Sequence, residues 1–276
     1  MSDIAMKTIL FPTDFSERTH PALDQAITYA ERLKMKLVIY HAYYRPATEW
    51  NTGRKLSESL QALEQGIDFK FEKLLDQHKK LRTVPHEFRK GLGISTEGIL
   101  SAAQEASTHL IIMATKGAKG FGELWGTKTA QIIQDTPVPV LVLPDNTRWE
   151  GFAKVGLVCD YSEAANYHTL DFLAELVKAL QLEVDVITLH RDEGAMTSQQ
   201  LAYQQLVRKQ LDGVPTTFHS VVHDKVEEGI VDYCQANAIG LIAILPKSYP
   251  FIKALFRESL TEKMAFHSPI PLLVLK

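Results

Sequence analysis

The chain has 276 residues, which at roughly 100–200 residues per domain gives two domains or one large one and excludes a mini-protein. Its 30 Lys and Arg residues against 33 Asp and Glu residues give a formal net charge of −3, so the bulk positive field of a nonspecific nucleic-acid binder is excluded. With 45% hydrophobic and 23% charged residues, the composition predicts a globular protein and not a disordered one.

In the first half of the chain, short apolar runs alternate with amphipathic stretches. The runs of strand length are residues 8–12, 37–42, 86–90, 109–114 and 138–143. The helical stretches are residues 23–33, 56–78, 95–106 and 127–135. Ser16 is the expected cap of the first helix, and Pro21 falls in its first turn. This alternation predicts a parallel sheet with helices on both faces, a doubly wound α/β domain.

The second half repeats this plan. Turn-forming residues at 144–151 interrupt the pattern and mark a boundary, so the predicted domains are residues 1–146 and 151–276. Residues 155–163 then repeat the residue types of 9–17, and residues 268–275 repeat those of 136–143. We expect two superposable sheets and not one continuous sheet. Each domain's last strand is short, apolar and flanked by prolines, and is therefore expected to be an edge strand covered by the other domain.

Several classes of site and location are not indicated by the sequence. Cys159 and Cys234 have no disulfide or metal-ligand spacing and are expected to be buried, inert thiols. The start shows no export signal and the longest apolar runs are strand-sized, so we expect a cytoplasmic protein with no membrane partner. A Walker P-loop, a nucleophile elbow and an HExxH motif are all absent from the sequence, so no enzyme activity is predicted.

Two smaller clusters leave alternatives open. His219 and His223 would share one face of a strand as metal ligands, but no third ligand is implied, and exposed or hydrogen-bonded histidines are the simpler interpretation. Tyr43, Tyr44 and Arg45 with Trp50 follow the second predicted strand, where they would either stack on a base or pack beneath a long connection, and we favour packing.

Three segments resemble the universal stress protein family. They are residues 8–16 (TILFPTDFS), the strand 110–113 running into Gly117 and Gly120, and Gly126-Thr127 followed by 137–142 (PVPVLV). The resemblance implies a Rossmann-like, five-stranded parallel sheet in each of two tandem domains, related by a pseudo-twofold as an intramolecular pseudo-dimer. It also implies that some members bind ATP or a related nucleotide while others do not.

The location of the matching residues suits a nucleotide. Ligands of open parallel sheets bind beyond the carboxyl ends of the strands, where Asp14 and the loop after Met113 fall, and glycines with a helix N-terminus suit phosphate. The resemblance assigns Thr13 and Asp14 to the adenosine, and the glycines, Thr127 and Lys128 to the phosphates. ATP is the candidate cofactor, Mg²⁺ is left open, and no metal ligand is assigned. The full candidate set is Pro12, Thr13, Asp14, Ala42, Met113, Gly117, Gly120, Gly126, Thr127 and Lys128.

The glycine loop departs from the family pattern in both halves. Between Gly120 and Gly126 it is four residues shorter than in nucleotide-binding members, and Ala114 stands where a glycine is usual. The second half has Pro250 and Glu258 in the corresponding stretch and keeps no signature glycine. Two interpretations therefore stay open: a stress-response regulator that binds an adenine nucleotide in its first domain, and a scaffold or interaction protein that binds none or takes another small molecule.

The sequences of the two loops predict that a substitution in the first loop changes ATP binding and one in the second loop does not. Gly126→Glu should abolish ATP binding with the fold intact, because it adds bulk and a charge that repels the phosphates. A change at Glu258 should leave ATP binding as it was. Calorimetric titration of the wild type and both variants measures the effect, and a stoichiometry near two per chain would contradict a degenerate second site.

Overall fold

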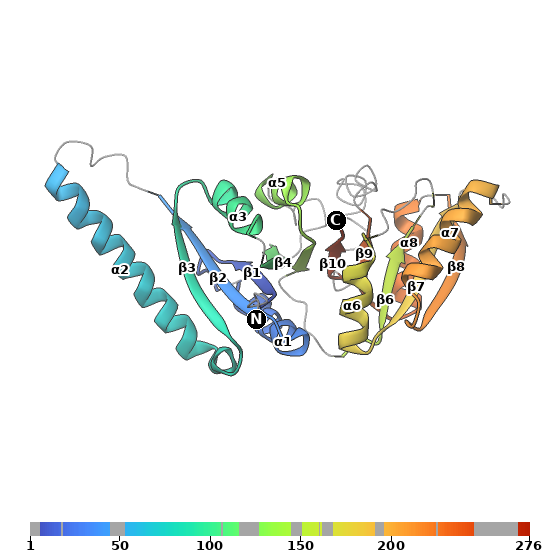
Figure 1. Cartoon of the computed structure of the whole chain (residues 1–276), viewed down its shortest axis with the longest axis horizontal. Helices are drawn as coiled ribbons and strands as arrows, with labels where there is room; N and C mark the ends of the chain where they lie inside the picture. Colours follow the sequence, from blue (N-terminus) through green and yellow to red (C-terminus); the bar gives the residue numbers. More distant parts are fainter. Residues whose placement is uncertain are drawn as a thin grey trace, which may run out of the picture.

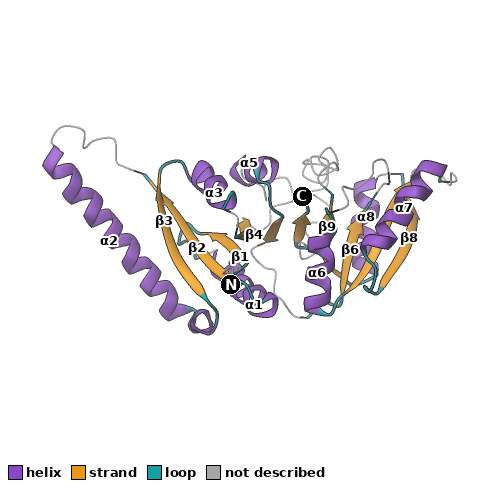
Figure 2. Ribbon diagram, viewed as in Figure 1, coloured by secondary structure: helices purple, strands orange, loops and turns teal. Residues whose placement is uncertain are grey.

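The computed structural model describes most of the chain, namely residues 6–17, 19–44, 53–105, 107–115, 127–144, 151–159, 161, 168–190, 196–224, 226–245 and 270–276. Helices and strands alternate along both halves, which lie side by side in Figures 1 and 2. The elements of the first half are β1 (Thr8–Pro12), α1 (Thr19–Leu33), β2 (Lys36–Tyr43), α2 (Gly53–Gln77), the 3-10 helix η2 (Lys79–Thr83), β3 (His86–Leu92), α3 (Ser95–Ala103), β4 (Thr108–Thr115), α5 (Thr127–Asp135) and β5 (Val140–Pro144).

The second half follows the same order of elements. They are β6 (Lys154–Val158), α6 (Asp171–Leu180), β7 (Glu183–His190), α7 (Ser198–Gln210), β8 (Thr216–Val222), α8 (Val226–Ala236), β9 (Ile239–Ile244) and β10 (Leu272–Val274). The predicted alternation of strands and helices is confirmed in both halves, with bounds that differ by a few residues. Ser16, the expected cap of α1, lies before the helix begins and instead accepts the Thr19 N–H at its carbonyl, 3.0 Å away.

The expectation of two separate sheets is wrong. All the strands form one sheet in the order β3-β2-β1-β4-β5-β10-β9-β6-β7-β8. Within each half every described pair is parallel, and the order 3-2-1-4-5 is mirrored by 8-7-6-9-10. The sheet is therefore two copies of one five-stranded parallel unit, joined edge to edge.

The junction is the antiparallel pair β5–β10. Leu141 lies opposite Leu273, and both side chains are fully buried. Each strand thus covers the free edge of the other half, as the apolar, proline-flanked last strands predicted. Polar contacts between described residues also join the halves: the Lys7 ammonium lies 2.7 Å from the Glu175 carboxylate, and the Lys276 ammonium donates to the Ile133 carbonyl.

Helices cover both faces of the sheet, because the side chains of each strand alternate between two cores. Ile9 and Phe11 of β1 point into the core under α1, α2, α6 and α7, whereas Leu10 points into the core under α3, α5 and α8. Figure 2 shows α3 and α5 on the opposite side of the first half's strands from α1. The structure is a three-layer, doubly wound α/β fold.

Backbone details repeat in both halves as well. Phe15 and Tyr161 follow the central strands β1 and β6 with φ of 62° and 53°, and Lys34 and Gln181 precede β2 and β7 with φ of 54° and 58°. Few residues other than glycine adopt this left-handed conformation. Its recurrence at matching positions is independent evidence that the halves are copies of one unit.

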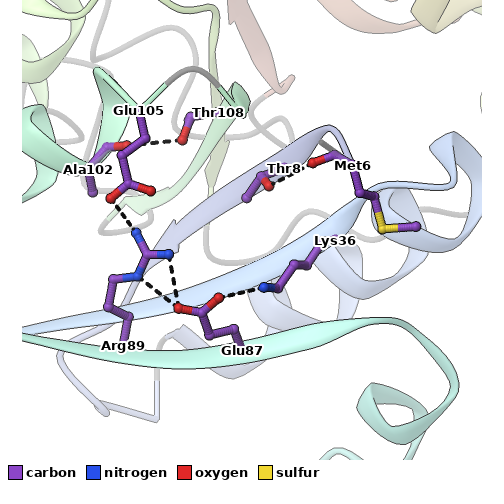
Figure 3. A network of polar contacts seen from close by, with 8 residues as sticks. All are labelled: Met6, Thr8, Lys36, Glu87, Arg89, Ala102, Glu105 and Thr108. Carbon is purple, nitrogen blue, oxygen red and sulfur yellow. Dashed lines mark hydrogen bonds and ion pairs between the residues drawn. The ribbon is translucent and has the colours of Figure 1, made fainter. Parts of the chain in front are cut away.

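A polar network ties α3 to the sheet (Figure 3). The Arg89 guanidinium on β3 bonds to Glu105 beyond the end of α3, at 2.5 Å, and to Glu87, at 2.9 Å. Glu87 also accepts from Lys36 on β2 at 2.5 Å. These groups are about one-third to one-half exposed, so each pair contributes at most about 1 kcal/mol. The network orients α3 more than it stabilises the fold.

Within the described ranges, no helix combines enough length and apolar character to cross a bilayer.

The junction generates a prediction about stability. Leu273→Ala should lower the free energy of unfolding by about 2–5 kcal/mol, because it leaves a cavity opposite Leu141. Leu201→Ala on α7 is the matched control, since this side chain is 48% exposed and its loss should change stability by less than about 0.5 kcal/mol. Urea unfolding followed by circular dichroism compares the two. Equal midpoints would show that the junction does not stabilise the molecule.

Candidate functional site

A cavity of about 310 Å³ lies at the carboxyl ends of β1, β2 and β4. Because these strands are parallel, their carboxyl ends lie at the same edge of the sheet, between α3 and α5. Six of the residues proposed from the sequence line the cavity, although they come from four separate segments of the chain: Pro12, Thr13, Asp14, Ala42, Met113 and Lys128.

The loop after β1 is held by its own hydrogen bonds. Thr13 N donates to the Tyr40 carbonyl at 2.8 Å, and Phe15 N donates to the Thr13 hydroxyl at 3.0 Å. Thr19 donates its hydroxyl to the Ser16 carbonyl at 2.8 Å. Because these bonds fix the turn between β1 and α1, Thr13 and Asp14 are presented to the cavity without a ligand.

Asp14 is an exposed carboxylate in this turn. Partial burial by itself would raise the pKa of this carboxyl, but the hydrogen bonds from Ser16, including the 2.9 Å bond from Ser16 N, outweigh burial and hold the pKa below its ordinary value. Asp14 is therefore ionised at neutral pH and able to accept hydrogen bonds from a ligand.

His41 lies beside Asp14 in the cavity wall. Its Nδ1 is 2.8 Å from the Thr13 carbonyl, which only accepts, so Nδ1 carries the proton. Burial lowers the pKa of His41, and the Lys70 ammonium acts in the same direction. The ring is neutral at pH 7, and its Nε2 is an acceptor. Phe15, in its left-handed conformation, packs on this ring with the centroids 4.5 Å apart.

Tyr40 forms part of the cavity wall, and two glycines make room for its hydroxyl. A Cβ on Gly91 of β3 would lie 2.0 Å from the Tyr40 oxygen, and one on Gly98 of α3 would lie 2.2 Å from it. No side chain larger than hydrogen fits at either position while Tyr40 keeps its place. Burial raises the pKa of this phenol, so it is neutral.

Sequence reasoning missed much of the lining. The missed residues lie near the ends of β2 and β4, at the start of α1, or on the inward faces of α3 and α5: Thr19, Tyr40, His41, Ser95, Thr96, Ile99, Ala114, Thr129 and Ile132. Ala114 had been noted only as a departure from the family pattern. The signal that was available is position, since α3 and α5 begin at the edge of the sheet where the parallel strands end, so one face of each helix start lies near the site.

The predicted phosphate loop is only partly described. Gly117, Gly120 and Gly126 lie outside the described residues, as do Pro250 and Glu258 of the second half. Thr127 is the first residue of α5, and Lys128, in the first turn of that helix, is exposed at the cavity. The helix N-terminus expected near a phosphate group therefore adjoins the cavity.

The two described residues of the aromatic cluster after β2 have different environments: one packs in the core and the other lines the cavity. Tyr43 is buried and donates to Glu64 at 2.5 Å, a bond that raises the pKa of the phenol to about 12, so packing is confirmed for this residue. Tyr44 instead is 55% exposed and lines the cavity. Arg45 and Trp50 lie outside the described residues.

His219 and His223, the possible metal ligands of the second half, lie near different carboxylates. His219 Nε2 lies 3.6 Å from buried Asp185, and His223 Nε2 lies 3.8 Å from Asp232. No group of three or more potential metal ligands occurs in the part of the chain that the structure describes. Both cysteines are buried, and burial raises the pKa of Cys234 to about 12, which keeps that thiol protonated.

Known proteins share both the sequence pattern and the fold. The universal stress protein family matches the chain twice, over residues 6–144 and 151–276. A universal stress protein of Thermus aquaticus is 31% identical over 139 residues, which are 50% of this chain and 98% of that protein. A universal stress protein structure from Archaeoglobus fulgidus gives a TM-score of 0.66 at 17% identity and covers 98% of both chains. A functionally unknown protein from Pseudomonas aeruginosa gives 0.57 at 15% identity, covering 99% of this chain and 93% of its own. At these identities the two solved structures show the fold alone.

The glycine cradle around Tyr40 generates a prediction. Gly66→Ala on α2, where a Cβ meets nothing within 4 Å, should stabilise the protein by about 0.5–1 kcal/mol through helix propensity. Gly98→Ala, also within a helix, should destabilise it because the methyl group overlaps the Tyr40 oxygen. Tyr40→Phe should rescue Gly98→Ala, since the nearest remaining ring carbon is 3.2 Å away. Thermal unfolding of the single and double variants gives the coupling, and additive effects would refute the cradle.

Proposed function

Because the chain belongs to the universal stress protein family, a family of stress-response proteins, we propose that its first half is a sensor domain that binds ATP or a related adenine nucleotide. The site is the cavity at the ends of β1, β2 and β4. The proposed domains are residues 1–146 and 151–276, in a cytoplasmic protein that acts through binding and conformation. Any hydrolysis is slow and incidental.

One observation carries the proposal. Residues chosen from the sequence for nucleotide contacts converge from the ends of three strands and the start of α5 on one cavity. Its volume of about 310 Å³ is at the lower end of the range for small-molecule sites, about 300–1,000 Å³. The cavity therefore suits the adenosine part of the ligand, with the phosphates reaching toward α5.

The lining offers complementary chemistry to adenosine. The ionised Asp14 carboxylate accepts hydrogen bonds from the ribose hydroxyls, a pairing stronger than one between neutral groups. Met113 and Ile99 provide apolar surface, and the exposed Tyr44 ring is available to stack on the base. Two acceptors, Asp14 and the His41 Nε2, lie together on the side assigned to the sugar.

The phosphates are placed at the start of α5. The N–H groups of the first turn of a helix and its macrodipole both favour an anion there. Lys128 adds an ammonium group at the same end of the cavity. In this arrangement the start of α5 and Lys128 neutralise part of the phosphate charge, so the shortened glycine loop need not neutralise all of it.

Asp14→Asn tests the proposal. The variant should bind ATP about tenfold more weakly, or worse, because a hydrogen bond to a charged group contributes about 1.5–3 kcal/mol. Asp76→Asn is the matched control, since Asp76 pairs with Arg82 on the surface and does not line the cavity. Calorimetric titration with ATP and with cAMP measures both variants against the wild type.

The outcomes separate the two interpretations left open by the sequence. Loss of affinity in Asp14→Asn alone supports the nucleotide site. Absence of binding by well-folded wild-type protein, at concentrations far above micromolar, overturns it and favours the scaffold interpretation.

A further inference from the structure

A second cavity, of about 360 Å³, lies on the α1/α2 side of the sheet. It is bounded by the segment before α1, by the first turn of α1 and by the exposed side of α2. Asp14 borders both cavities, and Phe15 lines only the second. Among the described residues, the ionisable groups that line it are Asp14, Glu17, His20, Lys70 and Lys73.

A chain of three side chains leads from the surface to this cavity. Asp24 Oδ1 lies 2.6 Å from His78 Nδ1, and His78 Nε2 lies 2.5 Å from His20 Nδ1. The His78 side chain is only 6% exposed, whereas Asp24 is 63% exposed. His20 is therefore the end of the chain that meets the cavity.

The distances fix where the protons are. A carboxylate only accepts, so His78 Nδ1 carries a proton. One further proton must lie between His78 Nε2 and His20 Nδ1, since two lone pairs or two N–H groups would repel each other at 2.5 Å. A neutral histidine pair then has no proton left for His20 Nε2. This nitrogen is the position at which the pair takes up its next proton.

That proton decides the charge of the cavity. Among the lining residues that the structure describes, the two ammonium groups of Lys70 and Lys73 are balanced by the two carboxylates of Asp14 and Glu17. With a neutral histidine pair these described groups carry no net charge, and protonation of the pair adds one positive charge. Protonation also turns His20 Nε2 into a third cationic donor beside the two lysines.

We propose that this second cavity is a proton-dependent binding site for a tetrahedral dianion, the chemistry shared by sulfate, free phosphate and phosphate monoesters. Lys70, Lys73 and protonated His20 bind the oxygens, and Asp24 holds His78 so that the pair can carry the added charge. Three separate donors match the three acceptor oxygens that a phosphate group presents. Asp24 and His78 are positioning residues, since neither lines the cavity.

The charged groups around His20 agree with binding that tightens as the pH falls. Burial lowers the pKa of His20 below its ordinary value of about 6.5, the facing His78 and the Lys73 ammonium lower it further, and Asp24 and Glu17 oppose them. Without an anion, His20 is therefore neutral at pH 7. A bound dianion favours the protonated pair, so binding takes up a proton and tightens as the pH falls toward that pKa.

Sulfate is the probe of choice, because it does not itself titrate between pH 5.5 and 8. We expect its affinity for the full-length wild-type protein to rise about tenfold from pH 8 to pH 6 at constant ionic strength set with chloride. The His20 ring signals in proton NMR, assigned by their loss in His20→Gln, should titrate at higher pH when sulfate is present. Phosphate and glycerol phosphate, measured at one pH, distinguish the free anion from an ester.

Variants distinguish sulfate binding from a purely structural role of the His20–His78 contact, which would only connect α1 to the residue before η2. His20→Gln should leave weak sulfate binding that no longer depends on pH, and Lys73→Gln should weaken binding about five- to tenfold at every pH. Lys80→Gln on η2 and His168→Gln, whose side chain is 84% exposed, are matched controls that should change neither quantity. Circular dichroism verifies that each variant is folded.

Wild-type sulfate affinity that does not change with pH, pH dependence that survives in folded His20→Gln, or an equal effect of Lys73→Gln and Lys80→Gln would each overturn the proposal. Since sulfate binding is measured without nucleotide, its failure leaves the proposed ATP site untouched, and the converse holds.

Discussion

The antiparallel pairing of β5 with β10 is the contact on which the rest of the molecule depends. Both strands are short and fully buried, and each has one partner within its own half, β4 or β9. Without the other half, one side of each strand would be an unpaired apolar edge, which globular proteins avoid. The same pairing places α1 against α6, and Lys7, just before β1, pairs with Glu175 of α6. The two copies of the fold therefore form one core on each face of the sheet.

The turn between β1 and α1 positions both proposed sites. Its hydrogen bonds present Thr13 and Asp14 to the cavity between α3 and α5, while Phe15, Glu17 and His20 line the cavity beside α2. The left-handed Phe15 packs against His41, which lines the first cavity, and against Phe71 of α2, with the Phe15 and Phe71 ring centroids 5.0 Å apart. A change in the position of α1 would therefore affect both cavities together, since the two share a wall.

Local pattern was sufficient to predict the strands, the helices and the duplication, because each depends on spacing along the chain. It also placed Asp14 and Met113 at the same edge of the sheet, where both line one cavity, since the ends of parallel strands meet at one edge. The continuous sheet was not predicted, because edge pairing between halves depends on orientation in space. The contact of Tyr40 with Gly98 and the contacts of His78 with His20 and Asp24 were not predicted either, because they arise only through packing between elements far apart in sequence.

The near symmetry of the junction has a consequence for molecules that meet during folding. β5 and β10 lie antiparallel, with Leu141 facing Leu273 at the centre and Val140 facing Val274 beside it. If the two halves of one chain separate, its β5 can therefore pair with β10 of a second copy as well as with its own β10. Exchange of halves between two chains would rebuild every junction contact, and the resulting swapped dimer would hide both edges as well as the monomer does.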